Sequence, residues 1–321
     1  MDAKRNAPKI DWEKFEPVKP SFTGNKLFEN YSLSELRKYI DWTPFFSTWM
    51  LKGKHPAILE DKVVGLEAKK LLDDANQMLD RIIGEDLLEA KAVVGFYPVN
   101  RIGDDISVLS NEKDGHLLTE LHFLRQQGKK SGVVPNYSLS DFLAPEEYGI
   151  DYLGFFAVTT GIGIEELISE FEANHDDYSS IMVKAVADRL AEAFAERMHE
   201  KVRKELWGYA ADEAYSSDDL IKEKYVGIRP APGYPACPDH TEKKKIWELL
   251  NVEDLTGIKL TESFAMFPAS SVSGYYFSHP ESRYFPIGKI GKDQVEDYAK
   301  RKGMSITEVE NWLASNLNYD K

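Results

Sequence analysis

Residues 229–240 have the sequence RPAPGYPACPDH, with four prolines, and form the most informative stretch of this chain. Because proline lacks an amide donor and locks φ, we predict a rigid loop here and exclude a helix or a central strand. Gly233 permits a close approach of the backbone, and we expect the amides and carbonyls near Ala231 to stay free. A stiff loop that presents Arg229 and Tyr234 looks like a binding surface. The alternative is a structural crossover whose arginine pairs with a surface carboxylate.

Helices are predicted on both sides of this loop. Ser32 and Glu35 form a capping-box pattern that opens a short helix through Ile40. Thr43 followed by Pro44 resembles an N-cap with proline in the first helical position. Apolar residues at helical spacing predict longer helices at residues 66–83, 164–173 and 179–207. Two more helices are expected near the C-terminus.

Runs rich in β-formers, separated by short polar turns, indicate an antiparallel meander. The strands are expected at Ala92–Val99, Asp105–Leu109, Thr119–Arg125, Leu153–Thr160, Ser271–Phe277 and Tyr284–Ile287. Helices and strands are interspersed without the strand-helix-strand regularity of a parallel sheet, so we predict an α+β fold with a mainly antiparallel sheet. Residues 1–24 contain three prolines among charges and are expected to be an extended strap or linker.

The composition excludes several classes of protein. The 321 residues carry 40 Lys and Arg against 54 Asp and Glu, a net charge of −14. This balance argues against nucleic-acid binding, which needs a basic face. Cys237 is the single cysteine, so no intrachain disulfide or cysteine-rich zinc site can form, and a reducing cytoplasm fits. The longest uncharged stretch is broken by Pro and Gly, and we expect no membrane anchor.

Motifs for cofactor, metal or nucleophilic chemistry are incomplete. Gly161 and Gly163 follow a predicted strand, but Glu166 stands where a dinucleotide fingerprint needs its third glycine. Cys237, with the nearby Asp239 and His240, could offer metal ligands, yet no second cluster completes a tetrahedral set. We therefore predict neither a metal site nor a catalytic side chain.

The loop at 229–240, with Thr241-Glu242-Lys243 after it, closely resembles the signature loop of the activation domain of cobalamin-dependent methionine synthase. The resemblance runs in order from about residue 25 to the C-terminus, and further matching segments are DWTPFF at 41–46, LTESFAM at 260–266, Ser273-Gly274, Phe277-Ser278 and DQVEDYA at 293–299. It implies one C-shaped α+β module over residues 25–321, with a twisted antiparallel sheet, that binds S-adenosylmethionine (AdoMet).

In that family, AdoMet remethylates cobalamin after the cobalt has been oxidised to inactive cob(II)alamin. The electron comes from flavodoxin or a flavoprotein reductase, and the cobalt is the nucleophile. The chain has no Asp-x-His-x-x-Gly segment for a lower cobalt ligand. The cobalamin is therefore expected on a separate domain or chain, and this module is not expected to make methionine alone. Lys52 and Lys54 are expected as basic contacts for an acidic redox partner. The alternative function is a docking protein for a cobalamin domain or a redox partner, without productive AdoMet binding.

The resemblance also implies a set of AdoMet ligands. Arg229 suits the carboxylate because its planar fork donates two parallel hydrogen bonds. The other implied ligands are Asp41, Glu192, Ala231, Tyr234, Tyr284 and Phe285. The family has two adjacent tyrosines where Tyr284 and Phe285 stand, so one hydroxyl is missing here.

Helical spacing alone treats Glu192 differently from the resemblance. It places Glu192 with Asp188 and Glu196 opposite the apolar stripe of the helix, as solvated acids. The resemblance instead implies that Glu192 lies on the inner wall of a cleft.

Overall fold

One antiparallel sheet forms the centre of the computed structural model, which describes residues 2–113, 115–130 and 134–320. Within these residues, its strands are β1 (Gly24–Phe28), β2 (Glu89–Ile102), β3 (Asp105–Leu109), β4 (Leu117–His122), β5 (Asp151–Ile162) and β8 (Ser271–Tyr276). The order is β4-β3-β2-β5-β8, and β1 also pairs with β2. The long β2 pairs with β5 along one edge, while β1 and β3 share its other edge.

Helices cover both faces of this sheet. One group comprises α2 (Leu33–Leu36), α3 (Thr43–Thr48), α4 (Gly65–Gly84), α5 (Ile164–Ala173) and α6 (Asp177–Lys201). The other comprises α8 (Lys243–Leu250), α9 (Val252–Thr256), α10 (Lys292–Lys302) and α11 (Ile306–Trp312). Alternate residues of β2 belong to different cores, with Val94 and Phe96 in the first and Val93 and Tyr97 in the second. Both faces of the sheet are therefore buried.

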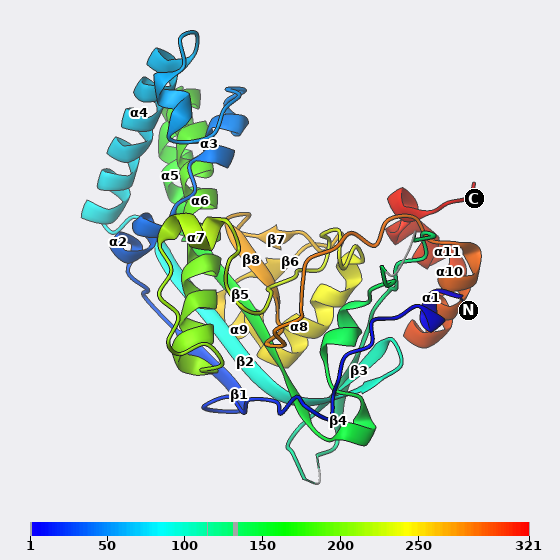
Figure 1. Cartoon of the computed structure of the whole chain (residues 1–321). Helices are drawn as coiled ribbons and strands as arrows, with labels where there is room; N and C mark the ends of the chain where they lie inside the picture. Colours follow the sequence, from blue (N-terminus) through cyan, green and yellow to red (C-terminus); the bar gives the residue numbers. More distant parts are fainter. Residues whose placement is uncertain (1, 114, 131–133, 321) are drawn as a thin grey trace.

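The two helical groups give the molecule its outline (Figure 1). Helices α3, α4, α5 and the start of α6 rise as an arm beyond one end of the sheet, while α10 and α11 pack at the far side. Between them lie the small hairpin of β6 (Lys259–Leu260) and β7 (Met266–Phe267) and the loops around it. The α+β fold with a mainly antiparallel sheet in a C-shaped module is as predicted.

Helix α6 follows its predicted apolar stripe closely. Val183, Val186, Leu190, Phe194 and Met198 are all fully buried. The predicted end of this helix is wrong, however, because the chain changes from α6 to a π-helical segment at Val202–Leu206. Within α4 the apolar pattern fails at Leu66, which is 88% exposed because it lies in the first turn, on the side away from the core.

Two predicted helix starts differ in detail. Trp42, not Thr43, is the N-cap of α3, and Pro44 lies inside the first turn. The amide of Thr43 instead donates to Asp41 Oδ1 (2.9 Å), so the residue before the N-cap accepts from the first amide of the helix. At α2, Ser32 accepts from the amide of Glu35, but the Glu35 carboxylate turns to Tyr31 and Arg197 and leaves the capping box half formed. The α2 helix is short, and a 3₁₀ turn at Arg37–Tyr39 follows it.

Two strand predictions need correction. The strand expected at Thr119–Arg125 is β4, which begins at Leu117 and ends at His122. The segment Tyr284–Ile287, expected as a strand, runs outside the sheet. Pro286 has no amide to donate. The amide of Ile287 donates to the carbonyl of Pro235 (2.8 Å) in the loop at residues 229–240, which we call the proline loop.

The N-terminal segment packs across the module. It begins with α1 (Asp2–Arg5), a short helix not predicted from the sequence, and continues without helix or strand to residue 23. Trp12 is 8% exposed and, with Phe15, packs on the ring of His279. The indole of Trp207 donates to the carbonyl of Val18 (2.7 Å). None of the helices in the described residues has the length and apolar character needed to span a bilayer.

Candidate functional site

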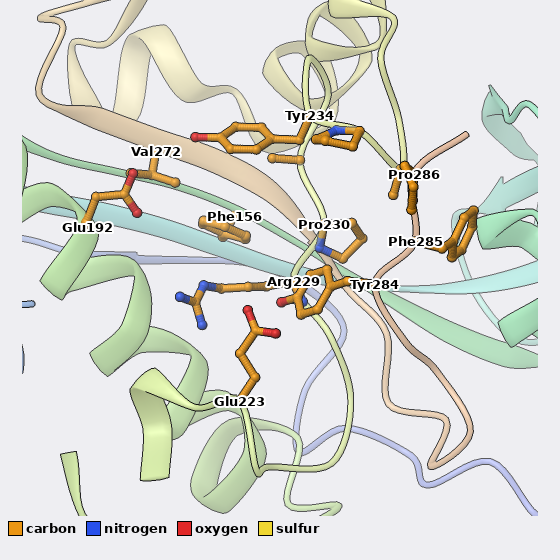
Figure 2. A pocket seen from close by; sticks show the side chains of 13 residues that line it. Phe156, Glu192, Glu223, Arg229, Pro230, Tyr234, Val272, Tyr284, Phe285 and Pro286 are labelled. Atoms are coloured by element: carbon orange, nitrogen blue, oxygen red, sulfur yellow. The ribbon is translucent and has the colours of Figure 1, made fainter. Parts of the chain in front are cut away.

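A cavity of about 550 Å³ lies where α6, the proline loop and the segment after β8 meet (Figure 2). Its walls are mainly apolar and carry a few charged groups. The lining residues are Phe156, Glu192, Glu223, Arg229, Pro230, Ala231, Tyr234, Pro235, Ala236, Val272, Tyr284, Phe285 and Pro286. A mainly apolar cavity with a few convergent polar groups is typical of a small-molecule site.

The proline loop reaches this cavity because it runs along the free edge of β8. Ile228 and Phe277 exchange two backbone hydrogen bonds (3.0 Å each), and Tyr275 donates to the carbonyl of Pro230 (2.9 Å). A side chain on Gly274 could not fit, since its Cβ would lie 2.5 Å from that carbonyl oxygen. Gly233 has φ +96° and presses against the His240 ring, so glycine is required there too.

We expected the amides and carbonyls near Ala231 to stay free, and this prediction is only partly correct. The carbonyls of Pro230 and Ala231 are used, by the amides of Tyr275 and Tyr234. The Ala231 amide has no acceptor among the described residues, so it is available at the cavity wall. Tyr234 stands over the cavity opposite Tyr284 and is 57% exposed.

Arg229 extends into the cavity between two glutamates, Glu192 and Glu223 (Figure 2). Its Nη2 lies 2.8 Å from Glu196 Oε2, and its Nη1 donates to the hydroxyl of Tyr225 (3.1 Å). Burial lowers the pKa of Arg229, but the Glu196 carboxylate, with Tyr225 and Tyr284, more than offsets this, so the net shift is upward and the guanidinium stays charged. The structural-crossover alternative is therefore wrong in one respect, because the carboxylate paired with Arg229 is buried and not on the surface.

The acidic residues of the cavity are partly desolvated. Burial raises the pKa of Glu192, which Arg189 and Arg229 lower only in part. Burial also raises the pKa of Glu223, a residue held at φ +53°. These carboxylates gain from a cation that enters the cavity, because the cation replaces the water that they have lost.

A second cavity of about 370 Å³ continues from the first and contains Asp41. Glu192, Glu223 and Arg229 line both cavities. The structure therefore brings six of the seven predicted residues to the first cavity and puts Asp41 in the adjoining one. The expectation from helical spacing, that Asp188, Glu192 and Glu196 are solvated, is correct for the exposed Asp188 and wrong for Glu196, which is buried. Glu192 is half-buried and lines both cavities.

Phe285 lies at the edge of the site with its ring turned away. The ring packs against Tyr137 and Phe142 in the second core, at centroid distances of 5.5 and 6.3 Å. Figure 2 shows it pointing away from the other cavity residues. A hydroxyl on this ring would therefore extend toward the second core, away from the polar groups of the cavity.

Sequence reasoning missed several residues of the site, chiefly Glu196, Glu223 and Tyr225. It also missed two strand residues that line the cavity, Phe156 of β5 and Val272 of β8. Glu223 follows the short helix α7 (Ser217–Ile221), in a segment with no recognisable motif. For Glu196, the spacing of α6 pointed to solvent. The one available signal was the three acids on a single helix face, which suits a charged cleft as well as a solvated surface.

The other predicted candidates lie outside the two cavities. Asp239 Oδ2 accepts from Lys302 (2.6 Å) and from Tyr298 (2.8 Å), so the carboxylate near Cys237 and His240 is already used. Lys52 and Lys54 are exposed after α3, and neither forms an ion pair with a described residue.

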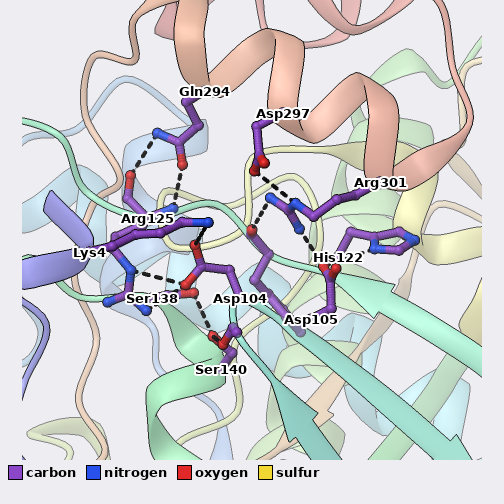
Figure 3. Close-up of polar contacts among 12 residues, drawn as sticks. Lys4, Asp104, Asp105, His122, Arg125, Ser138, Ser140, Gln294, Asp297 and Arg301 are labelled. Atoms are coloured by element: carbon purple, nitrogen blue, oxygen red, sulfur yellow. Dashed lines mark hydrogen bonds and ion pairs between the residues drawn. The ribbon is translucent and has the colours of Figure 1, made fainter. Parts of the chain in front are cut away.

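A smaller polar pocket of about 230 Å³ lies under α1 and α10 (Figure 3). Arg125 at its centre donates to Asp104 (2.6 Å) and Asp141 (2.6 Å), and its backbone pairs with the Gln294 amide. Lys4 of α1 lies 3.7 Å from Asp104. These paired groups join the N-terminal segment and α10 to the sheet, so we assign them a structural role.

Two comparisons with known proteins agree with this arrangement. The family model described as "Vitamin B12 dependent methionine synthase, activation domain" matches residues 32–303. The chain is also similar to a crystal structure of the MetH reactivation domain bound to AdoHcy, at 57% sequence identity and a TM-score of 0.96. That alignment covers 99% of this chain and 98% of the other.

Proposed function

The chain belongs to the family of vitamin B12-dependent methionine synthase activation domains, and on that premise we propose that its 550 Å³ cavity binds AdoMet. The function is support for the reductive methylation of cob(II)alamin to methylcobalamin, on a cobalamin domain of methionine synthase. The chain is one module of that enzyme and does not make methionine alone. AdoMet supplies the methyl group, and the protein binds and orients it.

The observation that carries this proposal is Arg229 inside the cavity, flanked by carboxylates. AdoMet has a carboxylate, an ammonium and a sulfonium. Arg229 suits the first because a guanidinium can donate a two-point hydrogen bond. Glu192, Glu223 and the adjoining Asp41 suit the two cations. The related MetH domain binds AdoHcy, which supports a ligand of this kind.

The remaining predicted ligands suit the adenosine half. We propose that Tyr234 and Phe156 contact the adenine ring, because both are aromatic and line the cavity. The free amide of Ala231 is available for a ring nitrogen or a ribose oxygen. Phe285 contributes through its backbone, since its ring is buried.

We also propose how the rest of the chain serves this function. Residues 25–321 form the AdoMet-binding module, and residues 1–24 are a strap that packs on it. The cobalamin is held by a separate domain or chain. Flavodoxin or a flavoprotein reductase supplies the electron and contacts Lys52 and Lys54. The exposed apolar residues Met50, Val63 and Leu66 lie near these lysines in the sequence and would add to such a contact. We place the protein in the cytoplasm, because a reducing compartment suits a chain whose single cysteine, Cys237, is a buried free thiol.

Calorimetric titration with AdoMet and with AdoHcy tests the proposed binding. We expect saturable one-to-one binding of both. Wild-type protein that binds neither would favour the alternative of a docking protein without productive AdoMet binding. A second assay mixes the chain with a cobalamin-bearing fragment, AdoMet and a low-potential reductant. The chain should speed the spectral change from cob(II)alamin to methylcobalamin.

A further inference from the structure

Tyr225 lies behind Arg229 and touches it through its hydroxyl. The residue is 7% exposed and does not line the large cavity. Its hydroxyl accepts from Arg229 Nη1 (3.1 Å). The Tyr284 oxygen in turn accepts from the backbone amide of Arg229 (3.0 Å). Two phenol oxygens therefore hold Arg229 at both ends, by its amide and by its guanidinium.

A buried ion pair supports the ring of Tyr225 from the other side. The guanidinium carbon of Arg203 lies 4.2 Å from the centroid of that ring, a cation–π contact. Arg203 is fully buried and donates to both carboxylate oxygens of Glu213 (2.7 and 2.6 Å). Arg203 belongs to the π-helical segment Val202–Leu206, and such segments occur often at functional sites.

The contacts of Arg229 leave one edge of its guanidinium available. Nη1 faces Tyr225 and the Nδ1 atom of His199 (3.3 Å), and Nη2 faces Glu196. Among the described residues no group accepts from Nε. A two-point hydrogen bond to a carboxylate needs two N–H groups of the guanidinium that point the same way in its plane. Tyr225 helps to fix the orientation of that plane.

We propose that Tyr225 is a positioning residue that orients Arg229 for the carboxylate of AdoMet, with the Arg203–Glu213 pair as its support. The inference rests on the proposed function of the cavity. The two parts of Tyr225 have separate tasks. The ring packs on Arg203 and His199, while the hydroxyl contacts Arg229, which lines the cavity.

Tyr225→Phe separates these tasks, because it removes the hydroxyl and keeps the ring. The experiment measures the dissociation constants of AdoMet and of decarboxylated AdoMet, which lacks the carboxylate, with thermal stability measured in parallel. Tyr225→Phe should weaken AdoMet binding roughly tenfold, the effect of one hydrogen bond, and change binding of the decarboxylated ligand by less than about twofold.

Tyr97→Phe is the matched control. It also removes one phenol hydroxyl, here bonded to Asn25 (2.7 Å) and the carbonyl of Leu249 (3.1 Å), away from the cavity. It should change neither dissociation constant. Equal weakening of both ligands by Tyr225→Phe, or unchanged AdoMet affinity, would overturn the positioning role while leaving the proposed function intact. A wild-type protein that does not bind AdoMet would overturn the proposed function, and this inference with it.

Discussion

Glu196 Oε2 lies 2.8 Å from Arg229 Nη2, in a pair whose side chains are 10% and 19% exposed. The other oxygen of Glu196 is buried without a hydrogen-bond partner among the described residues. The pair joins α6 to the proline loop; Arg229 lines both cavities and Glu196 lines the second. Arg229 therefore has a structural task in addition to the ligand contact that we propose for it.

Arg229→Ala should lower both stability and AdoMet affinity. The loop itself is braced by prolines, but the substitution strands the buried Glu196 carboxylate, and losing a hydrogen bond to a charged group costs about 1.5–3 kcal/mol. Adding Glu196→Gln to Arg229→Ala should restore most of the stability and none of the affinity. Denaturant midpoints and AdoMet titrations of both proteins test this. A double variant no more stable than the single one would contradict it.

As the pH is lowered, the affinity for AdoMet should begin to fall at a higher pH than it would with a glutamate of ordinary pKa. Burial raises the pKa of Glu192, so this carboxylate loses its charge, and with it its attraction for the ligand's cations, at a higher pH. Glu192→Gln should bind AdoMet more weakly at neutral pH and approach wild type as the pH falls. Parallel curves for the two proteins from pH 5 to 8 would count against a role for Glu192.

The raised pKa of Glu192 has the opposite effect on the stability of the unliganded fold, which should be greater in acid than at neutral pH. Because the pKa of Glu192 is raised in the folded state, its contribution is fully present below the unfolded pKa and is lost as the pH rises through the folded pKa. Glu192→Gln should therefore unfold at a higher denaturant concentration than wild type at pH 7, without ligand. Wild type and variant should converge near pH 4, where both carry an uncharged group.

Arg125→Met should destabilise the fold without touching the ligand site. Arg125, Asp104 and Asp141 are all at most 5% exposed at their side chains, and breaking such a buried set costs about 3–5 kcal/mol. Lys4→Met is the control. It removes the 3.7 Å contact of a 59% exposed lysine to the same Asp104 and should cost less than about 1 kcal/mol. Urea unfolding of both variants measures the two losses of stability. Equal losses of unfolding free energy would contradict the assigned role of Arg125.

Trp12→Ala should loosen the segment that carries Tyr284. Trp12 packs on His279 at a ring distance of 4.9 Å, and His279 lies between β8 and Tyr284 in the chain. Truncating a buried tryptophan costs about 3–5 kcal/mol, less if only the strap detaches. We expect faster amide exchange at residues 279–287 and weaker AdoMet binding. Val18→Ala, in the same strap but 42% exposed, should change neither. Exchange unchanged by Trp12→Ala would mean that the strap does not hold this segment.

Charge reversal at Lys52 and Lys54 should slow electron delivery from the flavodoxin partner that we propose. Both lysines are exposed on an otherwise acidic chain, and steering by complementary charge can change association rates tenfold or more at low salt. The double variant with Glu at both positions should reactivate roughly tenfold more slowly, with AdoMet affinity unchanged. Lys244→Glu combined with Lys259→Glu, two exposed lysines on α8 and β6, is the control because it changes the net charge by the same amount. A slowdown equal in both variants would exclude a specific contact.

Local patterns predicted the regular elements because each depends on neighbouring residues. The apolar stripe of α6 is as predicted, since side chains three and four residues apart meet on one face of a helix. The error at Tyr284–Ile287 has a different cause. Aromatic and β-branched residues favour a strand, but Pro286 and the bond from Ile287 to the proline loop hold the segment outside the sheet.

The amino-acid sequence by itself determined the rigid proline loop, the apolar faces of the helices and, through its resemblance to a family, the residues that we propose as ligands. Only the tertiary structure decided that Glu196 pairs with Arg229, that Glu223 and Tyr225 join the site, and that the Phe285 ring points into the core. Periodicity distinguishes one buried face from solvent. It cannot recognise a cleft, whose walls come from elements far apart in the chain and whose buried charges depend on partners that no local pattern contains.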